Sequence, residues 1–215
     1  MSENAAVSTE AELTEEPPFL DAGTAAYRRA NLAMFVGGFA TFAMLYGTQP
    51  ILPLLSEAFD ISPASASLSV SAGTAALALL LIPASILSDR IGRMRVMKTS
   101  LTLAAIVALA SPFVTDFNQL LVLRALLGAA LAGLPAAAMA YLGEEIAPQA
   151  QGRAMGLYIA GNALGGMSGR FISALVAQWS SWRIALGVLG VLGVIAAFLF
   201  WRSLPASRHF SPRAA

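Results

Sequence analysis

The stretch Ser85-Ile86-Leu87-Ser88-Asp89-Arg90-Ile91-Gly92-Arg93-Met94-Arg95 places one acid and three arginines between two long apolar segments. Uncharged residues run from 61 to 88 before the aspartate, and again from 99 to 115 after the arginines. An aspartate and arginines at a helix end form a compact charge cluster, and a glycine permits a tight turn. The stretch therefore predicts a short polar connection between two membrane-crossing helices.

The composition of the whole chain is that of a membrane protein. Of its 215 residues, 57% are hydrophobic and 12% are charged, and the mean hydropathy is +0.71. Soluble domains carry about 25% charged residues, and disordered chains are still more polar. A bilayer core of about 30 Å needs about 20 apolar residues for each crossing. The length therefore allows about six crossings with short connections, and we expect the lipid bilayer as a partner and no nucleic acid.

Uncharged stretches between charged residues give the positions of the crossings. The segment from 28 to 205 is predicted to form a six-helix bundle, whose helices span approximately 30–55, 63–88, 95–115, 117–143, 150–178 and 182–204. The acidic segment 1–27 is predicted to be a disordered tail, and residues 206–215 a short C-terminal tail.

Basic side chains gather in the connections on one side of the predicted bundle. Ten lysines and arginines fall before the first crossing, after the second, after the fourth and after the sixth, whereas the opposite side carries only Arg183. Positively charged loops stay in the cytoplasm. We therefore expect both termini to be cytoplasmic and, in a bacterial cell, an inner-membrane location.

Small and polar residues in the crossings suggest packing and binding positions. Glycines recur at helical spacing in the fifth crossing, where they favour close helix packing: Gly161, Gly165, Gly166 and Gly169. A substrate site near the midplane has few polar candidates, and each of them is equally suited to ordinary hydrogen bonding between helices: Tyr46, Gln49, Tyr158 and Asn162.

Two arginines fall inside predicted crossings. Arg124 lies about seven residues into the fourth crossing, where a charge is costly and usually faces a bundle interior or a wet cavity. The alternative is that it extends to the membrane surface, toward Asp116. For Arg170 we favour extension to the surface or a contact between helices. No Asp or Glu interrupts any crossing.

The stretch at 85–95 resembles the signature loop of the major facilitator superfamily of secondary transporters, G-x-L-x-D-R-x-G-R-[KR]-x, in which Ser85 replaces the first glycine and Met94 a basic residue. Further stretches resemble the same family in the same order: Leu120–Arg124, Glu144–Pro148, Gly156–Arg170 and Leu204–Arg208. The resemblance extends over residues 28 to 210 and is closest to the drug:proton antiporter branch, of the inner membrane transport protein type.

The resemblance implies an all-α fold with six transmembrane helices as a 3+3 inverted repeat, which is half of a major facilitator fold. It implies that Arg124 takes part in coupling, and that a loop gates the cytoplasmic side together with charged partners on the same face. The loop consists of Asp89, Arg90, Gly92 and Arg93, and the partners are Glu144, Glu145 and Arg153.

The expected function is transmembrane transport of a small organic solute or drug-like compound by alternating access, with proton-coupled antiport or efflux as one form. Because the family has two such halves, a second six-helix half is expected, from a homodimer or a separate chain. The alternative is a truncated, non-transporting protein or an interaction partner of a separately encoded second half.

An enzyme is the remote alternative. Ser168 in the fifth crossing superficially resembles the nucleophile of an intramembrane serine protease, which needs a histidine base within hydrogen-bond reach. His209, the only histidine, lies beyond the sixth crossing, and the chain has no cysteine. We therefore expect no enzymatic activity, no metal and no cofactor.

Overall fold

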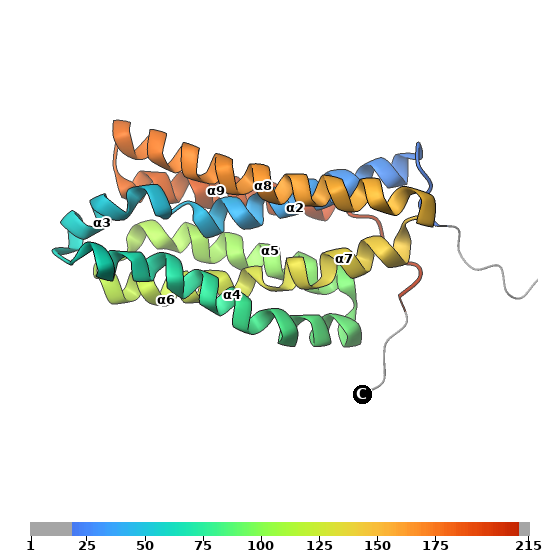
Figure 1. Cartoon of the computed structure of the whole chain (residues 1–215), viewed down its shortest axis with the longest axis horizontal. Helices are drawn as coiled ribbons and strands as arrows, with labels where there is room; N and C mark the ends of the chain where they lie inside the picture. Colours follow the sequence, from blue (N-terminus) through green and yellow to red (C-terminus); the bar gives the residue numbers. More distant parts are fainter. Residues whose placement is uncertain (1–18, 211–215) are drawn as a thin grey trace, which may run out of the picture.

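The protein is helical through most of residues 19–210, the part of the chain that the computed structural model describes. In chain order its helices are α2 (Ala25–Tyr46), η1 (Gln49–Ile51), α3 (Leu52–Phe59), α4 (Pro63–Ile91), α5 (Arg93–Ala110), η2 (Ser111–Phe113), α6 (Phe117–Leu131), α7 (Gly133–Glu145), α8 (Pro148–Trp179) and α9 (Trp182–Ser203). Figure 1 shows them running along one common axis. Within residues 19–210 there is no β-strand, which confirms the predicted all-α class.

Among the described helical segments, five are long and apolar enough to cross a membrane. The first combines α2, η1 and α3, and the fourth combines α6 and α7. The remaining helix, α8, has 32 residues and runs the length of the bundle, but it carries Arg153 and Arg170 and is not among the five. Its length, rather than its apolar composition, supports a sixth crossing.

Proline and glycine break two of the crossings into shorter helices. After α2 ends at Tyr46, Pro50 lies in the first turn of η1, where its missing N–H costs nothing. In the fourth crossing, Pro135 lacks the N–H that would bond to the carbonyl of Leu131. The helix α6 accordingly ends at Leu131, and α7 begins again at Gly133.

The helices pair in the way that an inverted repeat requires. The most extensive contacts join α2 with α8 and α9, α4 with α6 and α7, and α5 with α6, α7 and α9. If the first, second and third crossings are exchanged with the fourth, fifth and sixth, every contacting pair becomes a contacting pair of the same set. In Figure 1, α2, α8 and α9 form one layer of the bundle, α4 and α6 lie on the opposite side, and α5 and α7 lie between them.

Glycines bring α8 against the backbone of α2. A side chain at any of three successive glycines of α8 would collide with a carbonyl oxygen of α2: the added Cβ would lie 2.6 Å from Phe35 O at Gly161, 2.1 Å from Phe39 O at Gly165 and 2.4 Å from Ala43 O at Gly169. The four-residue spacing is the same on both helices, so the contact repeats at every turn. Gly166, the fourth predicted packing glycine, faces the Tyr46 ring instead, at 3.3 Å.

A second close approach joins α4 to α6. A Cβ on Gly128 would lie only 1.9 Å from the carbonyl oxygen of Gly73. The two backbones are therefore in contact at Gly128, which lies one helical turn after Arg124. The Arg124 guanidinium also lies beside Gly73.

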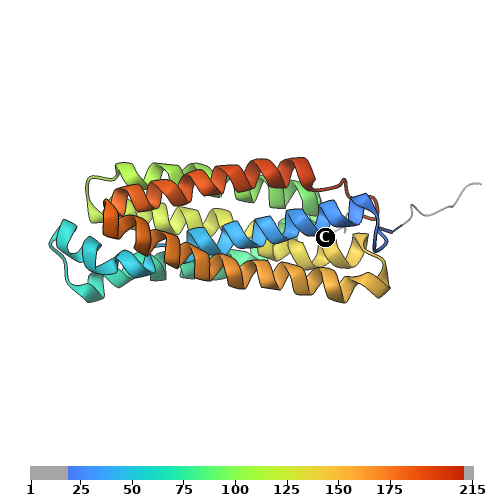
Figure 2. The same ribbon diagram turned by 90° about the horizontal axis from the view of Figure 1, so that it is seen from above.

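One edge of the bundle remains largely uncovered. Only 6% of the most apolar part of α4 is buried, and Leu79 and Ile82 are 76% and 71% exposed. The helix α8 exposes further large apolar side chains, including Met167 and Phe171. In Figure 2, α4 and α8 lie along the same edge, opposite α5 and α9.

We call the end of the bundle that holds Ala25, Ile91 and Ser203 the terminal end, and the opposite end the far end. Most of the predicted acidic tail, 1–27, lies outside the described residues. Its described part differs from the prediction, because Leu20 is buried and its backbone bonds to Glu145 and Ala147 at the terminal end. Leu20 is apolar and follows the acidic cluster at residues 10–16, so its side chain can pack against the bundle.

Candidate functional site

A cluster of charged side chains joins three helices at the terminal end. Gly92, with φ of +105°, separates α4 from α5 and places Arg93 in the first turn of α5. The Arg93 guanidinium is ion-paired with Asp89, lies 3.0 Å from a Glu144 oxygen, and donates to the Ser88 hydroxyl at 2.7 Å. We call these four side chains, Ser88, Asp89, Arg93 and Glu144, the terminal cluster. It fastens α4, α5 and α7 together, and Arg93 is only 5% exposed.

The other predicted gate residues lie outside the terminal cluster. Arg90 is exposed at the end of α4. Arg153 is exposed on α8, beside the first turns of α2 rather than beside Arg93. Of the three predicted partners, only Glu144 meets the gate loop.

Glu145 holds the segment that follows α9. Its carboxylate, 1% exposed, accepts from the backbone N–H groups of Arg208 at 2.8 Å and His209 at 3.1 Å, and from the Ser207 hydroxyl. The His209 ring also approaches Glu145 at 3.3 Å and stacks on Phe19. The residues are about 60 positions apart in the sequence, so no local pattern indicates this contact.

Arg124 is buried between α2, α4 and α6 and donates to backbone carbonyls. Its Nε lies 3.1 Å from Ser69 O and one terminal nitrogen lies 3.0 Å from Met44 O, while the other bonds to Leu45 O. Met44 and Leu45 belong to the last turn of α2, whose carbonyls have no partner within the helix. The Arg124 side chain thus caps the broken end of α2.

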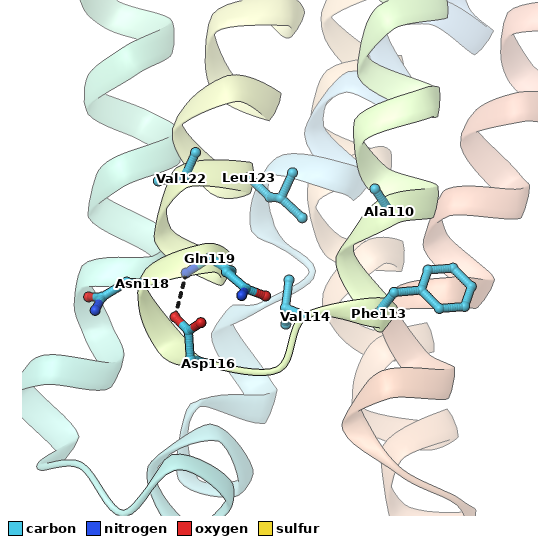
Figure 3. Close-up of a pocket in the computed structure, with 8 residues that line it drawn as sticks. All are labelled: Ala110, Phe113, Val114, Asp116, Asn118, Gln119, Val122 and Leu123. Carbon is cyan, nitrogen blue, oxygen red and sulfur yellow. Dashed lines mark hydrogen bonds between the residues drawn. The ribbon is translucent and has the colours of Figure 1, made fainter.

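Asp116 does not approach Arg124. Its carboxylate accepts from the backbone N–H of Gln119 at 2.9 Å and so caps the start of α6. Figure 3 shows this bond at the rim of a pocket of about 690 Å³ at the far end, between the end of α5 and the start of α6. The pocket contains none of the residues that we predicted to bind substrate.

Two of the four substrate-path candidates meet in a cavity of about 320 Å³ between α2 and α8. Tyr46 and Asn162 line it together with Arg170. The Arg170 guanidinium stacks on the Tyr46 ring at 4.4 Å, donates to Gly166 O at 3.0 Å, and bonds to the side-chain oxygen of Gln49. Arg170 therefore makes a contact between helices and connects a third candidate to the cavity. We call it the α2–α8 cavity.

Tyr158, the fourth candidate, is 3% exposed and packs with Asn162 against the bare backbone of Gly38. It lies one turn of α8 from the α2–α8 cavity and does not line it.

Polar groups in this bundle are few and lie between the apolar helices, an arrangement typical of membrane transport proteins. Sequence comparison gives the family. Residues 34–215 match the Major Facilitator Superfamily, and the chain belongs to it. The match confirms the resemblance seen in the loop at 85–95.

Similar proteins are known from bacteria. The chain is 47% identical over 200 residues to the inner membrane transport protein YnfM of Escherichia coli K12, and 46% identical over 195 residues to the uncharacterized MFS-type transporter YybF of Bacillus subtilis 168. These alignments cover 93% and 91% of the chain but 48% of each relative. The chain thus spans about half the length of these relatives.

A solved structure of the peptide transporter POT, in complex with alafosfalin, has the same fold. It matches with a TM-score of 0.75 over 85% of this chain and 40% of its own, at 16% sequence identity.

The protease alternative has no geometric support. Ser168 lies 20 residues along α8 from its start at the terminal end, a distance of about 30 Å in a helix. His209 is at the terminal end, where it contacts Glu145. The relatives that the chain matches within this superfamily are named as transporters.

Proposed function

We propose that the chain acts as one six-helix half of an alternating-access transporter for a small organic solute or drug-like compound. The observation that carries this proposal is the α2–α8 cavity, which gathers Tyr46, Asn162 and Arg170 in an otherwise apolar region. Its phenol, amide and guanidinium groups offer hydrogen-bond donors and acceptors as well as an aromatic face. Such a mixed lining suits an organic molecule with both apolar and polar groups.

In this proposal a second six-helix half packs on the uncovered edge formed by α4 and α8. The edge is apolar and broad, and the relatives are about twice as long as the segment they share with this chain. Either a homodimer or another polypeptide would supply the half. The protein would lie in a bacterial inner membrane, with the terminal end in the cytoplasm.

Rigid-body rocking of the two halves would open the path alternately to each side. The glycine contacts between α2 and α8 support movement of these two helices as one body, because close backbone packing resists rearrangement. The terminal cluster would act as the inner latch, since its ion pair between Arg93 and Glu144 joins helices that are distant in sequence.

Proton-coupled antiport is a second candidate, favoured by the burial of Arg124 at 2% exposure. A buried cation lowers the pKa of a carboxyl group that approaches it, and so expels its proton. The described acidic side chains all lie near the two ends of the bundle. The proton-carrying carboxylate would therefore belong to the second half.

Transport is tested in proteoliposomes with a panel of fluorescent organic dyes. The chain is reconstituted alone, and also after co-expression with the C-terminal half of YnfM. We expect dye flux in at least one preparation and a reduction of about tenfold in Asn162→Leu, which removes one polar group worth about 1.4 kcal/mol. The matched control is Gln178→Leu, an exposed amide near the end of the same helix.

The outcomes separate the candidates. Flux that responds to an imposed pH gradient supports proton coupling, and flux that does not respond contradicts it. Intact, folded protein with no flux in either preparation would favour the non-transporting alternative. Equal flux in Asn162→Leu and in the parent would show that the α2–α8 cavity is not the path.

A further inference from the structure

A groove of about 780 Å³ lies between the first turns of α2 and α8 at the terminal end. Arg28 of α2 and Arg153 of α8 line it, and both side chains are exposed. Among residues 19–210 neither of them forms an ion pair, whereas the neighbouring Arg29 donates to the carbonyl of Arg202. Two uncompensated positive charges therefore face one groove, which favours an anionic ligand.

The wall between the arginines contains polar groups that lack partners. Asn31 and Tyr27 line the groove and are only 8% and 5% exposed. Among residues 19–210, neither the Asn31 Oδ1 atom nor the Tyr27 hydroxyl has a hydrogen-bond partner. Buried polar atoms are nearly always satisfied. A headgroup hydroxyl would satisfy them once either side chain turns toward the groove.

Below the arginines the groove becomes apolar and leads along the helices. Leu32 and Phe35 of α2 face Leu157 and Ala160 of α8. Phe35 lies seven residues from Arg28, about 10 Å along the helix.

Phe35 also lines a second groove, of about 250 Å³, between α2 and α9. That groove is lined by apolar side chains such as Phe39, Ile195 and Leu199. Figure 2 shows α2 lying between α8 and α9 on this face of the bundle. Apolar surface thus extends on both sides of Phe35, from the positive groove to the groove between α2 and α9.

We propose that these two grooves bind one anionic phospholipid. Its phosphate lies between Arg28 and Arg153, its headgroup hydroxyls approach Asn31 and Tyr27, and an acyl chain follows Phe35 into the groove between α2 and α9. Basic pockets between helices at the membrane surface bind anionic headgroups. An acidic peptide would match the arginines but would leave the apolar path uncovered. The site is separate from the α2–α8 cavity, which shares none of its residues.

The test is native mass spectrometry of the full chain released from nanodiscs of phosphatidylglycerol mixed with phosphatidylcholine. We expect retained phosphatidylglycerol to fall about tenfold or more in the double variant Arg28→Gln/Arg153→Gln, since both arginines attract the anionic headgroup. The matched control is Arg90→Gln/Arg95→Gln, which removes two exposed charges from the same end. Ala160→Trp fills the apolar part without changing charge, and we expect it to reduce retention as well.

Each alternative has its own result. Equal loss in the control variant would show diffuse attraction to the surface instead of a site. Displacement of the lipid by excess inorganic phosphate would point to a free anion. A tenfold gain in lipid on removal of residues 2–16 would show that the acidic segment occupies the groove. Any of these three results, or full retention in Ala160→Trp, would overturn the proposal.

Discussion

Arg93 and Arg124 are both nearly inaccessible to solvent, but their partners differ in kind. Arg93 bonds to two carboxylates and a hydroxyl, and Glu144 is distant in sequence and carried by another helix. Arg124 bonds to three backbone carbonyls, two of which close the last turn of α2. Charge is neutralised in the first case. In the second case it is dispersed over the dipoles of the main chain.

This difference assigns different mechanical roles to the two sites. The Asp89 and Glu144 side chains are partly exposed, so water replaces Arg93 when the helices separate. The carbonyls that face Arg124 are deeply buried, and no water replaces it there. The terminal cluster is therefore suited to opening, whereas the Arg124 site is suited to holding α2, α4 and α6 in one arrangement.

The largest expected effect tests the Arg124 site. Arg124→Leu leaves the buried carbonyls of Met44 and Leu45 without donors, and at about 1 to 3 kcal/mol each the free energy of unfolding falls by about 2 to 6 kcal/mol. Arg124→Lys keeps the charge but offers fewer directed donors, so we expect an intermediate loss. The measurement is unfolding of the purified protein in mixed micelles. A loss below about 1 kcal/mol in Arg124→Leu would contradict the capping role.

The next effect concerns the helix contact beside that arginine. Gly128→Ala places a Cβ 1.9 Å from Gly73 O and pushes α4 from α6, which also lengthens the bond from Arg124 to Ser69. Overpacking of this kind costs about 1 to 3 kcal/mol. Gly156→Ala, where an added Cβ meets nothing within 4 Å, is the control and is expected to be neutral or stabilising. Equal stability of the two variants would show that the contact is not tight.

The smallest expected effect belongs to the terminal cluster. Glu144→Gln weakens a partly exposed ion pair and should lower the free energy of unfolding by only about 1 kcal/mol, because Asp89 still neutralises Arg93. Spin labels on α4 and α7 at the terminal end should nevertheless report a broader distance distribution. High salt should reproduce this broadening in the parent, because it screens the same ion pair. A narrow distribution under both conditions would contradict the latch.

The sequence predicts the contact between Asp89 and Arg93 in the terminal cluster, but it does not predict which glutamate joins them. Asp89 and Arg93 are four residues apart and share a face, so their spacing alone indicates contact. Glu144 and Glu145 are neighbours whose side chains diverge by about 100° around α7. Only one of them can face Arg93, and the choice depends on how α7 is rotated in the bundle. Helix packing fixes that rotation. As a result, Glu144 faces Arg93, and Glu145 bonds to the segment after α9.

The partners of Arg124 could not be predicted from residue types. Every residue has a carbonyl, so the sequence does not mark the ones at Ser69, Met44 and Leu45. The break in α2 does give an indirect signal, because a helix that ends inside the bundle leaves carbonyls that need donors. The grouping of Tyr46, Gln49 and Asn162 likewise depends on the pairing of α2 with α8. Hydropathy and charge gave the class of fold, since they depend only on composition along the chain.

The cap on α2 also constrains the order of biogenesis. Its acceptors precede Arg124 by 55 to 80 residues, so the ribosome completes both α2 and the first part of α4 before the donor is synthesised. Until α6 enters the membrane, the last turn of α2 retains unpaired carbonyls in a poorly hydrated environment. We therefore expect the first crossing to stay close to the translocon until the fourth crossing is inserted. The first and fourth crossings are then expected to insert cooperatively rather than as independent helices.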